Sequence, residues 1–221
     1  MEKFIFLLLA TCSVTTSAVS NSYYISIYGD VHKDAEFFNR TYPWIIDNIG
    51  GELTIEYNLL GSGRYSVPQT CALRELQGNN YLQAQYLKCE AEGNPSQYCL
   101  CKSGVDANKF KQCVAKGGEM AKWASNRYEE LVTSEQVDVT PVVKVWTEPA
   151  IFGEDDAGFL RKICKVFGDR IPRGCVNPIP IDDSNRFLDK KAIAQFDRTC
   201  HKEFPVSSDV EQPVNTTMTA I

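Results

Sequence analysis

The sequence lacks cysteine between Cys12 and Cys71. This gap contains Tyr28-Gly-Asp-Val-His-Lys-Asp-Ala-Glu-Phe-Phe38, where an expected strand ends and an expected helix begins. A thiolate is the nucleophile in disulfide exchange, and neither a carboxylate nor an imidazole can replace it. The absence therefore excludes dithiol chemistry from the first strand–helix connection.

Histidine, basic runs and long apolar runs are also scarce. The two histidines, His32 and His201, leave little material for a Ser-His triad, and Gly61-Ser-Gly63 lacks the nucleophile-elbow pattern. A net charge of −5 without a long Lys/Arg run argues against a nucleic-acid surface. No segment after the first twenty residues approaches the roughly 20 apolar residues that span a bilayer. We therefore expect no membrane span in the mature chain.

The first segment, residues 1–20, has the pattern of a secretory signal peptide. Lys3 precedes an apolar run from Phe4 to Ala10, and small residues around Ala18 and Ser20 suit cleavage. The apolar run is too short to span a bilayer. We expect the mature chain in the secretory pathway, either extracellular or in the endolysosomal lumen.

The remaining cysteines form an even set, which in an exported chain favours disulfides over free thiols. They are Cys71, Cys89, Cys99, Cys101, Cys113, Cys164, Cys175 and Cys200. The sequence leaves their pairing open. Two glycosylation acceptors, Asn39 and Asn215, each stand two residues before a threonine and fit the same compartment.

Hydrophobic periodicity predicts an α/β domain over residues 21–175. The expected strands are Tyr23–Tyr28, Leu53–Leu60 and Val137–Val145, and the expected helices include Asp34–Asn48, broken near Pro43, and Ala157–Phe167. A cysteine-bearing helical insertion is expected over about residues 70–133, with helices at Asn108–Val114 and Glu119–Leu131 and a buried stripe of Leu73, Leu76, Tyr81, Tyr86 and Leu87. From Arg173 the chain becomes proline-rich and irregular, and residues 176–221 are expected to be a partly disordered extension with one short helix near Asp189–Phe196.

Four stretches together carry a family likeness. They are Cys71-Ala-Leu-Arg-Glu-Leu76, Cys113 to Asn126 with its Gly-Gly-Glu-Met step, Val139-Thr-Pro-Val-Val143, and Leu160-Arg-Lys-Ile-Cys164 closed by Cys175. In this order the sequence resembles the gamma-interferon-inducible lysosomal thiol reductase (GILT) family. The resemblance implies a thioredoxin-like fold with a disulfide-bonded helical insertion. The family's Cys-x-x-Cys would fall on Val31-His-Lys-Asp34, and its Cys-Gln-His-Gly signature is also missing from this chain.

The resemblance directs attention to two segments. Val31, His32, Lys33 and Asp34 would stand at a helix N-terminus, where His32 or Asp34 could bind a ligand; alternatively Asp34 caps the helix and His32 is a solvated loop residue. Pro141 resembles the cis-proline that faces the dithiol in thioredoxin-like folds, so a cis bond after Thr140 is expected. With Tyr28, this segment would line a groove for an extended chain, unless it is retained for structure alone.

Cys99 and Cys101 are the one closely spaced cysteine pair and would form an alternative redox site, because a disulfide two residues apart is exchange-prone. The other interpretation is that each pairs elsewhere, one of them with Cys200. A zinc site built from Cys99, Cys101, Cys113 and Cys200-His201 matches no standard spacing. Glu154-Asp-Asp156 and Asp182-Asp183 could bind calcium but are equally explained as solvated turns.

The sequence thus predicts a secreted or endolysosomal glycoprotein that has lost its catalytic dithiol and binds a protein or peptide partner. We expect neither a cofactor nor a metal. The alternative function is a thiol-disulfide oxidoreductase acting through Cys99 and Cys101.

Overall fold

A computed structural model describes residues 23–60, 65–117, 126–131, 133, 139–145 and 148–181. Its centre is a three-stranded mixed sheet of order β2-β1-β3. Strand β1 (Tyr23–Asp30) pairs in parallel with β2 (Leu53–Leu60) and antiparallel with β3 (Val142–Val145). An isolated bridge between Val143 and Ile151 extends the sheet beyond β3.

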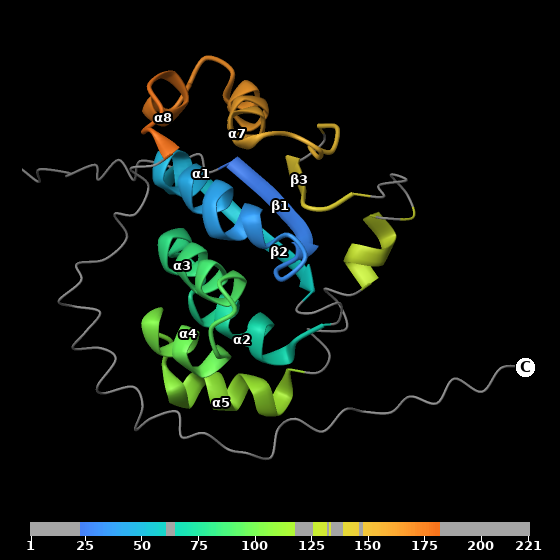
Figure 1. The fold of residues 1–221 in the computed structure, drawn as a ribbon, viewed down its shortest axis with the longest axis vertical. Coiled ribbons are helices and arrows are strands. Elements are labelled where there is room, and N and C mark those ends of the chain that lie inside the picture. Colours follow the sequence, from blue (N-terminus) through green and yellow to red (C-terminus); the bar gives the residue numbers. More distant parts are fainter. Residues whose placement is uncertain are drawn as a thin grey trace, which may run out of the picture.

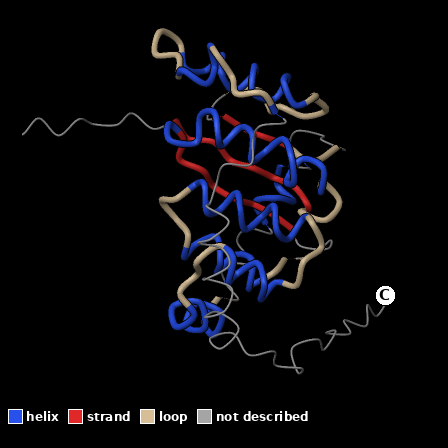
Figure 2. The backbone as a smooth tube through the Cα atoms, turned by 60° about the vertical axis from the view of Figure 1, so that its left-hand side comes forward, coloured by secondary structure: helices blue, strands red, loops and turns tan. Residues whose placement is uncertain are grey.

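Helices surround this sheet (Figure 2). After β1 come the π-helical turn η1 (Phe37–Thr41), α1 (Tyr42–Ile49) and the 3-10 turn η2 (Gly50–Glu52). The insertion contains α2 (Val67–Glu75), α3 (Asn80–Ala91), α4 (Ser96–Lys102) and α5 (Ala107–Lys116). Residues 126–131 are also helical. After β3 come α7 (Asp156–Cys164), η3 (Lys165–Phe167) and α8 (Arg173–Val176). Figure 1 places α7 and α8 at one end of the molecule and α2 to α5 at the other. Within the described segments, no helix has the length and apolar character needed to cross a membrane.

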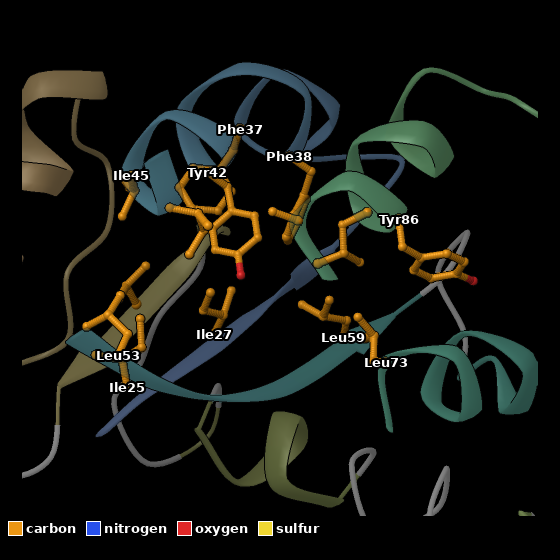
Figure 3. Packing of buried hydrophobic residues seen from close by; sticks show 14 of the residues in the cluster. Ile25, Ile27, Phe37, Phe38, Tyr42, Ile45, Leu53, Leu59, Leu73 and Tyr86 are labelled. Atoms are coloured by element: carbon orange, nitrogen blue, oxygen red, sulfur yellow. The ribbon is translucent and has the colours of Figure 1, made fainter. Parts of the chain in front are cut away.

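The main core lies between the sheet and the helices α1 and α3. Ile25 and Ile27 of β1 are each 1% exposed and face the aromatic side chains of Phe38 and Tyr42 (Figure 3). The two rings have centroids 6.0 Å apart in an edge-to-face arrangement. Burial of each large apolar side chain stabilises the fold by about 1.5–3 kcal/mol, so this layer holds the sheet against the helices.

Pro43 shapes the helix that follows β1. Because proline has no N–H, it cannot donate to a carbonyl one turn earlier. The chain forms the π-helical turn η1 just before it, and the Tyr42 N–H bonds to the carbonyl of Phe37. The predicted break near Pro43 therefore takes the form of a π-helical turn followed by α1, which has Pro43 in its first turn.

The helical insertion departs from the predicted stripe at one residue. Gly78 adopts a φ of +90°, and the Asn79 side chain caps α3 by accepting from the Leu82 N–H at 3.1 Å. This turn resets the helical phase between α2 and α3. Tyr81 is consequently 40% exposed, so its predicted burial was wrong, whereas Leu73, Leu76, Tyr86 and Leu87 are buried.

Two elements at the C-terminal side also differ from expectation. β3 begins at Val142 rather than Val137, directly after the cis Thr140–Pro141 bond that the sequence predicted. The short helix α8 lies in the stretch expected to be irregular. It packs closely on α1, because a Cβ added at Gly174 would lie 2.0 Å from the Asn48 carbonyl oxygen.

The folded part continues past Cys175. The Ile179 N–H donates to Asn48 Oδ1 at 2.8 Å, and Trp44 Nε1 donates to the Ile179 carbonyl at 2.5 Å. Both partners belong to α1. The expected signal peptide (1–20) and most of the expected extension, including the helix near Asp189–Phe196, lie outside the described residues.

Three disulfides join neighbouring helices. Cys71–Cys113 connects α2 with α5, and Cys89–Cys99 connects α3 with α4. Cys164–Cys175 connects α7 with α8. Cys101 is also disulfide-bonded. Two of the three bridges therefore lie within the helical insertion.

Removing these bridges should destabilise the protein. Closing a loop lowers the entropy of the unfolded chain, by about 4 kcal/mol for the 42-residue separation of Cys71–Cys113 and about 3 kcal/mol for the 10-residue separation of Cys89–Cys99. Urea unfolding of each paired Cys→Ala variant should show losses of this order, and full reduction should unfold the insertion. Unchanged unfolding after complete reduction would contradict this role.

Candidate functional site

The turn after β1 is built around the Asp30 carboxylate. Asp30 is 1% exposed, and its Oδ1 accepts the backbone N–H groups of His32 at 3.0 Å and Lys33 at 3.2 Å. The Val31 N–H donates to the Leu60 carbonyl at 3.0 Å, which continues the β1–β2 pairing into the turn. Asp30 thereby satisfies the free N–H groups at the start of a helical segment.

Asp34 bridges this turn to the segment before β3. Its Oδ2 accepts the Asp30 N–H at 2.8 Å, and its Oδ1 accepts the Thr140 hydroxyl at 2.9 Å. The carboxylate also lies against Gly29, where an added Cβ would stand 2.7 Å from Oδ2. Asp34 therefore ties the end of β1 to the Thr140–Pro141 segment, a role closer to the structural interpretation than to a free ligand-binding group.

The Asp34 side chain is half-buried. Burial raises the pKa of Asp34, and the hydrogen bonds from Asp30 and Thr140 oppose this shift. Burial also raises the pKa of Tyr128, with a further increase from the negative charge of Asp34. Both groups therefore favour their neutral forms more than exposed groups would.

The predicted binding residues separate into buried and accessible groups. Tyr28 is 3% exposed and packs with Leu131 and Val142, so it belongs to the core and not to an open binding surface. Val31 is fully buried. His32 and Lys33 are exposed, whereas Thr140 and Pro141 are partly exposed.

A groove of about 410 Å³ opens beside the Asp34–Thr140 contact. Its walls come from the turn after β1, from η1, from the segment before β3 and from the start of α7. The lining residues are Lys33, Asp34, Glu36, Phe37, Thr41, Thr140, Pro141, Glu154, Asp155, Asp156 and Phe159. No cysteine is among the described residues that line this groove.

One wall of the groove is acidic. Asp155 caps α7 by accepting the Gly158 N–H at 2.6 Å, and Glu154 pairs with Lys162 at 2.6 Å. Asp156 pairs with Arg40 at 3.5 Å and accepts from the Thr41 hydroxyl. These contacts explain the 154–156 cluster as a helix cap and ion pairs.

Other predicted sites fall away from the groove or outside the described residues. Cys99 is bonded to Cys89, so it does not form the alternative redox pair with Cys101. In the described part of the chain, no group of three or more His, Cys, Asp or Glu is arranged to hold a metal ion. Asn39 is exposed, as a glycosylated side chain must be. Residues Asp182, Asp183, Cys200, His201 and Asn215 lie outside the described ranges.

Sequence reasoning missed Asp30, Tyr128 and the contribution of residues 154–156 to the groove. The signal available for Asp30 was its four-residue spacing from Asp34, which suits two carboxylates capping one turn. No residue pattern near either segment indicated that the start of α7 would approach the turn after β1. That proximity depends on the pairing of β3 with β1, which lie far apart in the sequence.

A second buried carboxylate, Glu90, lies between α2 and α3. It is 6% exposed and accepts from the Tyr86 hydroxyl at 2.5 Å and from Gln69 Nε2 at 2.7 Å. Burial raises the pKa of Glu90, while these two hydrogen bonds and the charge of His32 lower it. The His32 interaction relates this cluster to the turn after β1.

Comparison of the sequence with protein-family models and with curated proteins finds no match. Comparison with solved structures finds none either.

The Asp34–Thr140 hydrogen bond should couple the two segments energetically. Asp34→Ala removes the acceptor, and Thr140→Val removes the donor. A double-mutant cycle of the free energies of unfolding in urea should give a coupling free energy of about 1 kcal/mol between the two side chains. The exposed change Asp169→Asn serves as the control with little effect. Fully additive losses would show that the contact is not formed in solution.

Glu90 should make stability depend on pH with a defined sign. Its folded-state pKa lies above the ordinary carboxyl value, so the folded protein binds a proton more tightly than the unfolded chain. Stability relative to Glu90→Gln should therefore rise as the pH falls through the folded-state pKa, and level off below the unfolded-state pKa. Urea midpoints of both proteins across the acidic range measure this. A difference that shrinks or reverses on acidification would contradict the assignment.

Proposed function

We propose that this protein is a GILT-like, thioredoxin-like glycoprotein of the secretory pathway that has lost its dithiol and binds an extended polypeptide in the groove beside Asp34. One observation carries the proposal: the groove lies between the turn at 31–34 and the Thr140–Pro141 segment, yet its described lining contains no cysteine. A substrate channel of the proposed family would stand here, without its nucleophile.

The strand arrangement supports the proposed fold. β1 has a parallel neighbour on one side and an antiparallel neighbour on the other. The antiparallel strand follows the cis Thr140–Pro141 bond, and a helix follows it in turn. A thioredoxin-like fold requires these relations between a central strand, the helix after it and a cis-proline segment opposite the start of that helix.

The chemistry of the turn argues against thiol exchange. Asp30 and Asp34 supply the negative groups at the helix start, and a carboxylate does not attack a disulfide sulfur. Cys89 and Cys99 are 1% and 0% exposed and bonded to each other. A buried disulfide offers no accessible sulfur to a substrate, which disfavours the alternative oxidoreductase function.

The groove suits a polypeptide with basic side chains. The described lining contains one cation, Lys33, and five carboxylates, those of Asp34, Glu36, Glu154, Asp155 and Asp156. Asp155 caps α7 and Asp156 pairs with Arg40, so Glu36, which is exposed on the rim, is the carboxylate that we expect a partner to contact. Complementary charge increases the rate of encounter and sets the orientation of the bound chain. The partly exposed Thr140 and Pro141 offer an adjacent main-chain segment for an extended partner.

The three disulfides fit an oxidising compartment. Asn39 is exposed and can carry a glycan added in the secretory pathway. Extracellular and endolysosomal locations both meet this condition.

The first test is catalytic. The purified protein should not accelerate insulin disulfide reduction beyond a free-thiol control at acidic or neutral pH, because no thiolate faces the groove. Catalysis that disappears in Cys99→Ser would overturn the proposal and establish the oxidoreductase alternative.

The second test is binding. A fluorescent peptide of alternating Lys and Thr should bind more tightly than its Glu–Thr counterpart, with the difference decreasing at high salt. Glu36→Lys should weaken Lys–Thr binding by several-fold to about tenfold, whereas Asp169→Lys, also exposed, should not. Equal binding of both peptides, or equal effects of the two variants, would show that the groove does not select a basic chain.

A further inference from the structure

The outer edge of β2 differs from the edge facing β1. Main-chain groups alternate in direction along a strand. The Leu60 carbonyl accepts from the Val31 N–H at 3.0 Å and so points toward the β1 side of the strand. The Leu53 carbonyl accepts from Asn80 Nδ2 at 2.8 Å and so points away from β1. The odd-numbered residues of β2 therefore present their main-chain groups outward.

Three of these outward residues have unpaired main-chain groups in the described part of the chain. In the described segments, the main-chain N–H and C=O groups of Ile55, Tyr57 and Leu59 form no hydrogen bond within the protein. Ile55 and Tyr57 are partly exposed, so a partner strand can reach them, whereas Leu59 is 4% exposed. Unpaired edge groups of this kind are a template for an added strand.

A pocket of about 310 Å³ lies along this edge, between β2 and α2. Leu59 and Leu73 lie side by side within it (Figure 3). The lining residues are Tyr24, Thr54, Ile55, Glu56, Tyr57, Leu59, Gln69, Thr70, Leu73, Arg74, Gln77 and Gln83. The three residues with unpaired main-chain groups are all among them.

The two faces of the edge differ in polarity. Glu56 lies on one face, where its Oε2 accepts from the Tyr24 hydroxyl at 2.6 Å and from the Ser26 hydroxyl at 3.0 Å. Leu59 and Leu73 lie on the other. A strand added here would meet a negative charge on one face and apolar side chains on the other.

We propose that the outer edge of β2 binds an extended partner strand in which cationic and apolar side chains alternate. The partner's main chain pairs with Ile55 and Tyr57, its cationic side chains face Glu56, and its apolar side chains enter the space beside Leu59 and Leu73. This site is separate from the groove at Asp34, because the sheet order β2-β1-β3 puts β2 and β3 on opposite edges.

Charge favours such a partner over a second copy of this chain. β2 carries one carboxylate, Glu56, and no cation. Arg74 of α2 is the one cation among the described lining residues of the pocket, and it does not lie on the strand. Pairing two β2 strands would therefore place two Glu56 carboxylates in one small sheet, with no cation on either strand. A strand with lysine or arginine at alternate positions supplies the opposite charge.

The experiment uses two fluorescent octapeptides of alternating Lys and Val with blocked ends, one of them N-methylated at every residue. N-methylation removes the main-chain donors and leaves the side-chain charge unchanged. The unmodified peptide should bind the purified protein and slow amide exchange at Ile55 and Tyr57. The methylated peptide should bind at least about tenfold more weakly.

Gln77→Trp should fill the pocket and weaken binding to a similar extent. The matched control Gln112→Trp on α5, also exposed, should bind as the wild type does. Glu36→Lys at the other groove should leave protection of the β2 amides unchanged, so failure of this site and failure of the proposed function are distinguishable. Circular dichroism confirms that each variant is folded.

Three outcomes would overturn the proposal. They are equal binding of both peptides, no saturable binding at millimolar concentration, and unchanged amide exchange along β2. A concentration-dependent dimer in sedimentation that Gln77→Trp dissociates would assign the edge to a second copy of the chain instead.

Discussion

Strand β1 is the constraint on which the rest of the structure depends, because both its edges and both its faces are occupied. It pairs with β2 and β3, and Ile25 and Ile27 enter the main core. Tyr28 packs on the opposite face with Leu131. A strand held in this way has one register, so the position of the turn at its end is determined to within a residue.

That fixed position gives the turn after β1 its geometry. Helix starts present N–H groups that favour negative partners. Here Asp30 and Asp34 provide them, and Asp34 also reaches Thr140 on the segment before β3. Two carboxylates thus satisfy the electrostatics of a site that in the proposed family holds a thiolate. They stabilise the turn without supplying a redox nucleophile, which is why the proposed function is binding.

The described part of the molecule has a groove beside Asp34 and a separate pocket along β2. The groove beside Asp34 is walled by charged side chains from α7, whereas the edge of β2 exposes main-chain groups beside an apolar pocket. The disulfide-bonded insertion forms one side of the second region through α2, and the buried Glu90 ties α2 to α3.

The cis bond before Pro141, which the structure contains, was expected from the family resemblance and not from a local pattern. The sequence by itself determined the order of strands and helices, the break at Pro43 and the absence of a thiol near the first helix. These features depend on local periodicity or on the chemistry of single residues. Tertiary structure alone decided the pairing of Cys99 with Cys89, the burial of Tyr28 and the approach of α7 to the turn after β1. Each of these depends on contacts between segments far apart in the chain. Such contacts are selected by the packing of the whole core, and no short stretch of sequence encodes them.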